Sequence, residues 1–176
     1  MCNLSRRVAI FGNCHQAEKS DHTEAVVRLL REAGMQVAVE REFLNFLREQ
    51  TVHGRFFQTV DGFDTAECAA DLAFSMGGDG TFLTVAEKVR DRRIPILGIN
   101  TGHLGFLAEV TTSGLETAIA RVGRGEYEVQ ERSLIAIEDE DKELTLYPFA
   151  LNEVALLKYD NSSLIEVETR VEGALL

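Results

Sequence analysis

Short apolar runs alternate with amphipathic stretches along residues 7–123. The apolar runs lie at residues 8–11, 37–39, 72–76 and 94–99. Between them, apolar residues recur at intervals of three and four, which is the spacing of one face of a helix. Because strands buried on both faces read as continuous apolar runs, the pattern predicts a parallel sheet with helices on both faces.

The same spacing places the helices along the chain. They are expected at residues 25–33, 43–47, 82–89 and 115–122. Gly34 follows the first of them, where a helix C-terminal glycine is common. Residues 51–65 are polar and contain two glycines, Gly54 and Gly62, so we expect a loop there.

The pattern changes near residue 125, after which no helical period follows. Strands are expected at residues 126–129, 134–137 and 144–157. Residues 165–171 alternate strictly between apolar and polar, which is typical of an antiparallel strand with one solvated face. We therefore expect an α/β domain over residues 1–124 and the first strands of an all-β domain over residues 125–176.

The C-terminal residues are apolar. Glu172 and Gly173 resemble a turn, and Leu175 and Leu176 resemble the start of a returning strand. Since natural termini are more often polar and frayed, we expect the chain to be cut inside its β-domain. The alternative is a small domain that ends on a short strand.

Composition excludes several classes of function. The net charge is −11 and Lys and Arg form no run, so we expect no binding to nucleic acid, which requires a basic face. No apolar stretch of about 18 residues is present and the N-terminus does not resemble a signal peptide, so we expect a cytoplasmic protein without membrane contact. The 3 cysteines and 4 histidines lack ligand spacing, which argues against a disulfide framework or a zinc site.

A glycine-rich turn, Gly-Gly-Asp-Gly-Thr at residues 77–81, lies between a predicted strand and a predicted helix. Glycines there let the backbone approach a ligand, and the helix that follows directs free N–H groups at it. Thr81 is expected to cap that helix. The turn lacks the lysine of a P-loop and the third glycine of a dinucleotide fingerprint. Asp79 is therefore a candidate base for phosphoryl transfer, or a candidate metal ligand.

Three motifs, in this order, resemble the NAD kinase family. The first, at residues 77–81, is similar to a signature that NAD kinases share with diacylglycerol-type lipid kinases and phosphofructokinases. Residues 96–107, with Asn100, Gly102 and Gly105, are similar to the G-I-N-x-G-x-L-G-F-L stretch of NAD kinases. Residues 150–154 resemble the family's Asn-Glu motif. Together the motifs cover nearly the whole chain.

The resemblance implies roles for five residues. Asp79 would accept the proton of the hydroxyl that receives the phosphate, and Gly80 would form part of the NAD site. Asn152 and Glu153 would bind NAD through ribose hydroxyls and adenine, for which an amide and a carboxylate are chemically suited. Phe106 would wall the nucleotide pocket.

The implied reaction is transfer of the terminal phosphoryl of ATP, or of polyphosphate, to the 2′-hydroxyl of the adenosine ribose of NAD. Mg²⁺ would accompany ATP, no metal ligand is assigned to the protein, and the complete protein would be a homo-oligomer. The sequence departs from the family at Thr84, where many relatives carry Arg or Lys, and in lacking the later T-G-S-T-A-Y stretch. Two alternatives stay open: a catalytically incomplete binding or assembly module, and a lipid or sugar kinase that shares only the first motif.

Overall fold

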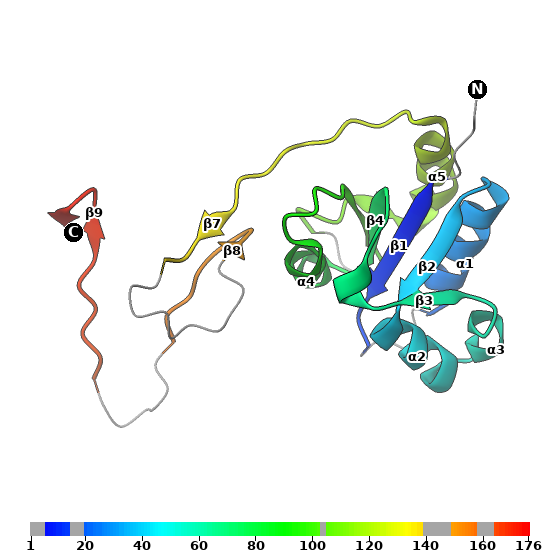
Figure 1. The fold of residues 1–176 in the computed structure, drawn as a ribbon, viewed down its shortest axis with the longest axis horizontal. Coiled ribbons are helices and arrows are strands. Elements are labelled where there is room, and N and C mark those ends of the chain that lie inside the picture. The colour runs from blue at the N-terminus through cyan, green and yellow to red at the C-terminus, as the bar shows by residue number, and fades with distance from the viewer. Residues whose placement is uncertain (1–5, 15–19, 103–104, 139–148, 158–163) are drawn as a thin grey trace.

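The computed structural model describes residues 6–14, 20–102, 105–138, 149–157 and 164–176 (Figure 1). Six of its strands form one sheet in the order β3-β2-β1-β4-β5-β6. Their bounds are β1 Arg7–Gly12, β2 Gln36–Glu40, β3 Asp61–Phe63, β4 Leu72–Met76, β5 Ile96–Asn100 and β6 Val110–Thr111. Every neighbouring pair in this sheet is parallel, which confirms the predicted α/β fold class.

Helices cover both faces of this sheet. They are α1 Ser20–Glu32, α2 Arg41–Gln50, α3 Gly54–Phe57, α4 Asp79–Val89 and α5 Leu115–Arg124, with short 3₁₀ helices at η2 Thr65–Glu67 and η3 Thr112–Gly114. Alternate residues of β1 point to opposite faces. Val8 and Ile10 pack with apolar residues of α1, α2 and α5, whereas Ala9 and Phe11 pack with residues of α4. The two clusters form the core.

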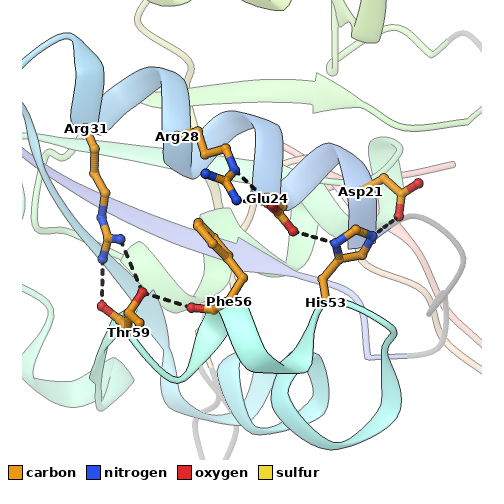
Figure 2. A network of polar contacts seen from close by, with 7 residues as sticks. All are labelled: Asp21, Glu24, Arg28, Arg31, His53, Phe56 and Thr59. Carbon is orange, nitrogen blue, oxygen red and sulfur yellow. Dashed lines mark hydrogen bonds and ion pairs between the residues drawn. The ribbon is translucent and has the colours of Figure 1, made fainter.

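Polar contacts tie α1 to α3 and to the residue before it (Figure 2). The imidazole of His53 lies between two carboxylates of α1, with its Nε2 2.6 Å from Asp21 and its Nδ1 beside Glu24. Arg28 donates to Glu24 and places its guanidinium 4.6 Å from the centre of the Phe56 ring. These contacts hold α3 in the layer that α1 and α2 form.

The predicted loop at residues 51–65 is wrong, because this stretch contains both α3 and β3. Two residues of this stretch, Phe57 and Val60, are buried. Strand β3 joins the sheet by backbone pairing with β2, while Asp61 and Gly62 stay exposed. An edge strand with exposed polar side chains leaves no apolar run in the sequence, so its pattern is that of a loop.

Beyond α5 the chain forms two small antiparallel sheets. One pairs β7 Ile135–Ala136 with β8 Phe149–Ala150, and the other pairs β9 Arg170–Val171 with β10 Ala174–Leu175. The turn predicted at Glu172 and Gly173 is confirmed, since both have positive φ values of 50° and 84°. In Figure 1 the segment runs away from the large sheet, and most of its apolar side chains are exposed.

The strands predicted in this segment are either longer than the observed ones or do not form. Residues 126–129 form no strand, and the predictions at 134–137 and 165–171 shrink to two paired residues each. Of residues 144–157, the first five lie outside the described residues and only Phe149–Ala150 of the rest pair. Alternation identifies residues suited to a strand, but a strand forms only where a second backbone edge accepts its hydrogen bonds. The domain division at residues 124 and 125 stays a prediction.

Candidate functional site

The order of the sheet predicts a ligand site at the carboxyl ends of β1 and β4. From β1 the sheet extends one way through β2 and β3 and the other way through β4, β5 and β6. In open parallel sheets ligands bind outside the carboxyl ends of the strands at such a reversal. The glycine-rich turn leads from β4 into α4 at this place, so the candidate site lies where the topology favours one.

Two kinds of glycine build this turn. A Cβ on Gly77 would overlap the Thr81 side chain, so only glycine fits there. A Cβ on Gly78 or Gly80 would meet no atom within 4 Å, so a ligand can approach the backbone of both residues closely. The expected cap by Thr81 is wrong, because α4 begins at Asp79 with Gly78 as its N-cap and without a side-chain capping bond. Thr81 lies inside the first turn instead.

The carboxylate of Asp79 accepts three backbone hydrogen bonds from one loop. Phe106 donates to Oδ2 at 2.8 Å, and Leu107 and Ala108 donate to Oδ1 at 3.0 and 3.1 Å. These bonds, that of Phe106 first, favour the charged form and lower the pKa of Asp79. Their contribution to stability is therefore present above the ordinary pKa of 3.8 and lost as the pH falls through the lowered pKa.

The same loop exposes Phe106. Its side chain is 93% exposed although its own N–H is bound to Asp79. Two residues further on, Ala108 is buried and packs close to Gly98 of β5. The structure thus brings together Asp79, Gly80 and Phe106, three of the five residues that the sequence indicated.

Asn152 and Glu153 do not contact Asp79 but line a cavity beside α4. This cavity, of about 230 Å³, lies between the outward face of this helix and the chain around β8. The residues lining the cavity are Leu83, Thr84, Ala86, Glu87, Leu134, Phe149, Ala150, Leu151, Asn152 and Glu153. Apolar walls with a few polar side chains are typical of small-molecule sites. Asp79 and Phe106 are not among the lining residues, so the cavity contains only two of the five candidates.

The sequence interpretation missed two features of α4. Thr84 and Glu87 line the cavity, and Glu87 lies three residues after Thr84 and four after Leu83, a spacing that would have placed it beside both on the helix surface. Lys88 is engaged elsewhere, with its Nζ 2.6 Å from an oxygen of the buried Glu40. Lys88 therefore does not replace the positive charge that is missing at Thr84.

The described residues contain neither a membrane-spanning helix nor a metal-binding cluster. None of the helices in these ranges is long and apolar enough to cross a membrane. Across the same ranges, no group of three or more His, Cys, Asp or Glu side chains is placed to hold a metal ion. Oδ1 of Asp79 accepts two of the loop N–H groups and Oδ2 accepts one, so Oδ2 retains a free acceptor site.

Comparison with known proteins gives consistent matches. Residues 8–127 match the model of the ATP-NAD kinase N-terminal domain. The chain is 45% identical over 170 residues to an NAD kinase of Bacteroides fragilis, covering 97% of this chain and 58% of that one. It is 37% identical over 163 residues to an NAD kinase of Porphyromonas gingivalis, covering 92% of this chain and 55% of that one. It thus spans little more than half the length of these curated relatives.

A solved structure shares the fold. Yeast NADH kinase in complex with NADH superposes with a TM-score of 0.69 at 16% sequence identity, over 86% of this chain and 48% of the other. At this identity the likeness concerns the fold alone. The family model, by contrast, covers well over half of the chain, including the Gly-Gly-Asp-Gly turn. From these matches and the turn that begins α4, we conclude that the chain belongs to the NAD kinase family.

Proposed function

We propose that the protein is an NAD kinase that transfers the terminal phosphoryl of ATP to the 2′-hydroxyl of the adenosine ribose of NAD. The observation that carries this proposal is the placement of Asp79, Gly80 and Phe106 together beyond the carboxyl end of β4, where the sheet order reverses. Family membership supports the same reaction. Because the chain spans 58% of the Bacteroides fragilis relative, the activity is proposed for the full-length protein.

In the proposed reaction the ribose O2′ attacks the terminal phosphorus of ATP. The new O2′–P bond forms as the bond from phosphorus to the leaving oxygen of ADP breaks, and the hydroxyl proton passes to the Asp79 carboxylate. A carboxylate of lowered pKa is a weak base, which suits a loose transition state in which the proton leaves late. Gly80 offers open backbone beside it, and Phe106 provides an apolar wall.

Asn152 and Glu153 are proposed to bind the nucleoside of NAD from the cavity beside α4. The Asn amide both donates and accepts, and the Glu carboxylate accepts from ribose hydroxyls. For these groups to reach a nucleotide held at Asp79, the ligand must extend along α4 from its N-terminal residue. Thr84 and Leu83, which line the cavity on that helix, would lie along its course.

Mg²⁺ is proposed to arrive with ATP, held by the phosphate oxygens as part of that substrate. We assign no protein ligand to it and no step of the reaction to it. We also propose that the full-length protein is cytoplasmic and forms a homo-oligomer.

The alternative for residues 1–176 by themselves is a binding or assembly module without catalysis. The specific observation in its favour is that these residues span only 58% of the Bacteroides fragilis relative. A lipid or sugar kinase is disfavoured by family membership, since the shared first motif is accompanied here by the other two.

The decisive experiment supplies purified full-length protein with ATP, Mg²⁺ and one acceptor at a time. We expect NADP from NAD, detected with an NADP-specific dehydrogenase, and no product from diacylglycerol or hexoses. Parallel reactions with NADH and with polyphosphate determine the preferred acceptor and donor. Phosphorylation of a lipid or sugar without NADP formation would refute the proposal.

A further inference from the structure

The loop of residues 105–108 combines a bound backbone with a free aromatic side chain. Three consecutive N–H groups donate to the Asp79 carboxylate at 2.8, 3.0 and 3.1 Å. Hydrogen bonds to a charged acceptor are roughly twice as strong as neutral ones. The Phe106 ring, carried by the first of these residues, is 93% exposed.

Gly105 makes this approach possible. A Cβ at this position would overlap Oδ1 of Asp79 and lie 2.6 Å from its Cγ. Gly105 is not among the residues of positive φ, so its requirement is for space and not for backbone conformation. With any side chain here, either the loop or the Asp79 carboxylate would have to move, and the contact between them would be disturbed.

The far end of the loop is fixed separately. Ala108 is 0% exposed, and its Cα lies 2.6 Å from where a Cβ on Gly98 would be. This packing holds the loop at Ala108 whether or not Asp79 is charged. The direction of the backbone at Phe106, in contrast, depends on the hydrogen bonds to Asp79.

We propose that Asp79 and Gly105 form a positioning element that presents Phe106 to the nucleotide, in addition to the role of Asp79 at the hydroxyl. The inference rests on the proposed function. A base that stacks on an aromatic ring gains binding free energy. Holding the ring in place before binding reduces the ordering cost, so the benefit appears as NAD affinity. Gly105 acts here through Asp79 and touches no reacting atom.

Gly105→Ala tests positioning separately from loss of the base, because it disturbs the contact between the loop and Asp79 and leaves the carboxyl group in the protein. In the full-length enzyme we expect the KM for NAD to rise roughly tenfold, the effect of losing one charged hydrogen bond. We expect kcat to fall by less than about threefold, since the candidate base remains. Gly114→Ala is the matched control, because its added Cβ meets no atom closer than 3.6 Å.

A second measurement does not depend on kinase activity. Residues 1–176 contain no tryptophan, so Phe106→Trp places a reporter on the loop, and the Phe106 parent corrects for any tryptophan elsewhere in the full-length protein. We expect the fluorescence anisotropy of this reporter to fall when Gly105→Ala or Asp79→Asn is added, and to stay unchanged with Gly114→Ala. Far-UV circular dichroism verifies that each variant is folded, and Asp79→Asn decides the matter if Gly105→Ala does not fold.

The outcomes separate the two proposals. Unchanged anisotropy in a folded Asp79→Asn variant would overturn the positioning role, even if the enzyme makes NADP. Reduced anisotropy in a protein that makes no NADP would confirm the contact and refute the kinase proposal. An unchanged KM for NAD in folded Gly105→Ala with reduced anisotropy would show that the ring does not contribute to binding, which also overturns the inference.

Discussion

The two tasks proposed for Asp79 make opposite demands on its carboxylate. A proton acceptor benefits from a raised pKa, whereas the N–H groups of Phe106, Leu107 and Ala108 lower it. Phosphoryl transfer tolerates this, because its loose transition state relies on positioning and charge stabilisation more than on a strong base. The residue therefore links the loop geometry to the proposed chemistry.

Asp79→Asn is expected to lower kcat by roughly 10²–10⁴-fold, the usual contribution of a general base. An amide accepts fewer of the three loop N–H bonds, so the KM for NAD should rise as well, by a smaller factor. Steady-state kinetics of the full-length enzyme, with NAD and ATP varied in turn, measure both. A variant with near-normal turnover would remove Asp79 from catalysis.

Asn152→Ala and Glu153→Ala are expected to act mainly on the KM for NAD. Both side chains are exposed in the cavity beside α4, so their loss should leave the fold intact. Each lost hydrogen bond to the substrate should cost roughly 1–3 kcal/mol in binding. Steady-state kinetics and thermal melts of the same samples decide the question, because an unchanged KM with lowered stability would indicate a structural pair.

At the scale of elements, α4 organises the candidate site. Its N-terminal residue is Asp79, its outward face lines the cavity, and its Lys88 reaches the end of β2. There the Nζ of Lys88 lies 2.6 Å from Oε1 of Glu40, and Thr65 donates to the same oxygen at 2.7 Å. The Glu40 side chain is only 5% exposed, so this pair joins helix and sheet in a poorly solvated place.

Lys88→Met is expected to lower the free energy of unfolding by about 1–3 kcal/mol, because it leaves the buried Glu40 carboxylate with a single hydroxyl donor. Urea denaturation followed by circular dichroism measures the change. Arg41→Met is the control, since Arg41 and Asp64 form an ion pair whose side chains are about half exposed, and such pairs contribute little. Equal decreases in the free energy of unfolding for both variants would contradict the expectation that the buried Lys88–Glu40 pair contributes more than the exposed Arg41–Asp64 pair.

At the scale of the molecule, the α/β part and the segment beyond α5 differ in how they bury apolar surface. The former has a core on each face of its sheet. The latter exposes large apolar side chains, among them Leu156 at 77% and Leu157 at 88%. Its short strands also leave backbone edges that can pair with another chain.

Residues 1–176 produced alone are therefore expected to associate and to show little NAD kinase activity. Exposed apolar surface and free strand edges favour association, and lost orientation of two substrates forfeits several kcal/mol of barrier lowering. Light scattering and an NADP assay test this, with the combined variant Leu156→Glu and Leu157→Glu expected to associate less. A monodisperse monomer with robust turnover would contradict the prediction.

The sequence by itself determined the features that depend on near neighbours. Apolar runs and helical spacing predicted β1, β2, β4, β5 and the longer helices, because burial on both faces of a parallel sheet selects those patterns. The motif at residues 77–81 and the turn at Glu172 and Gly173 were likewise readable, since short turns impose local backbone requirements. The turn itself indicated Asp79, and family resemblance added Gly80, Phe106, Asn152 and Glu153.

Only the tertiary structure decided what distant segments do to one another. Strand β3 forms because its backbone pairs with the edge of β2. Residues 126–129 pair with no strand and do not form the predicted one. The hydrogen bonds to Asp79 join residues that are 27 to 29 positions apart in the chain. The residues around either partner do not specify how close the two come in the fold. A local pattern determines which residues suit a helix or a strand. Contacts between helices and strands are decided when the whole sheet packs, because backbone hydrogen bonds and the burial of apolar side chains must then be satisfied at the same time.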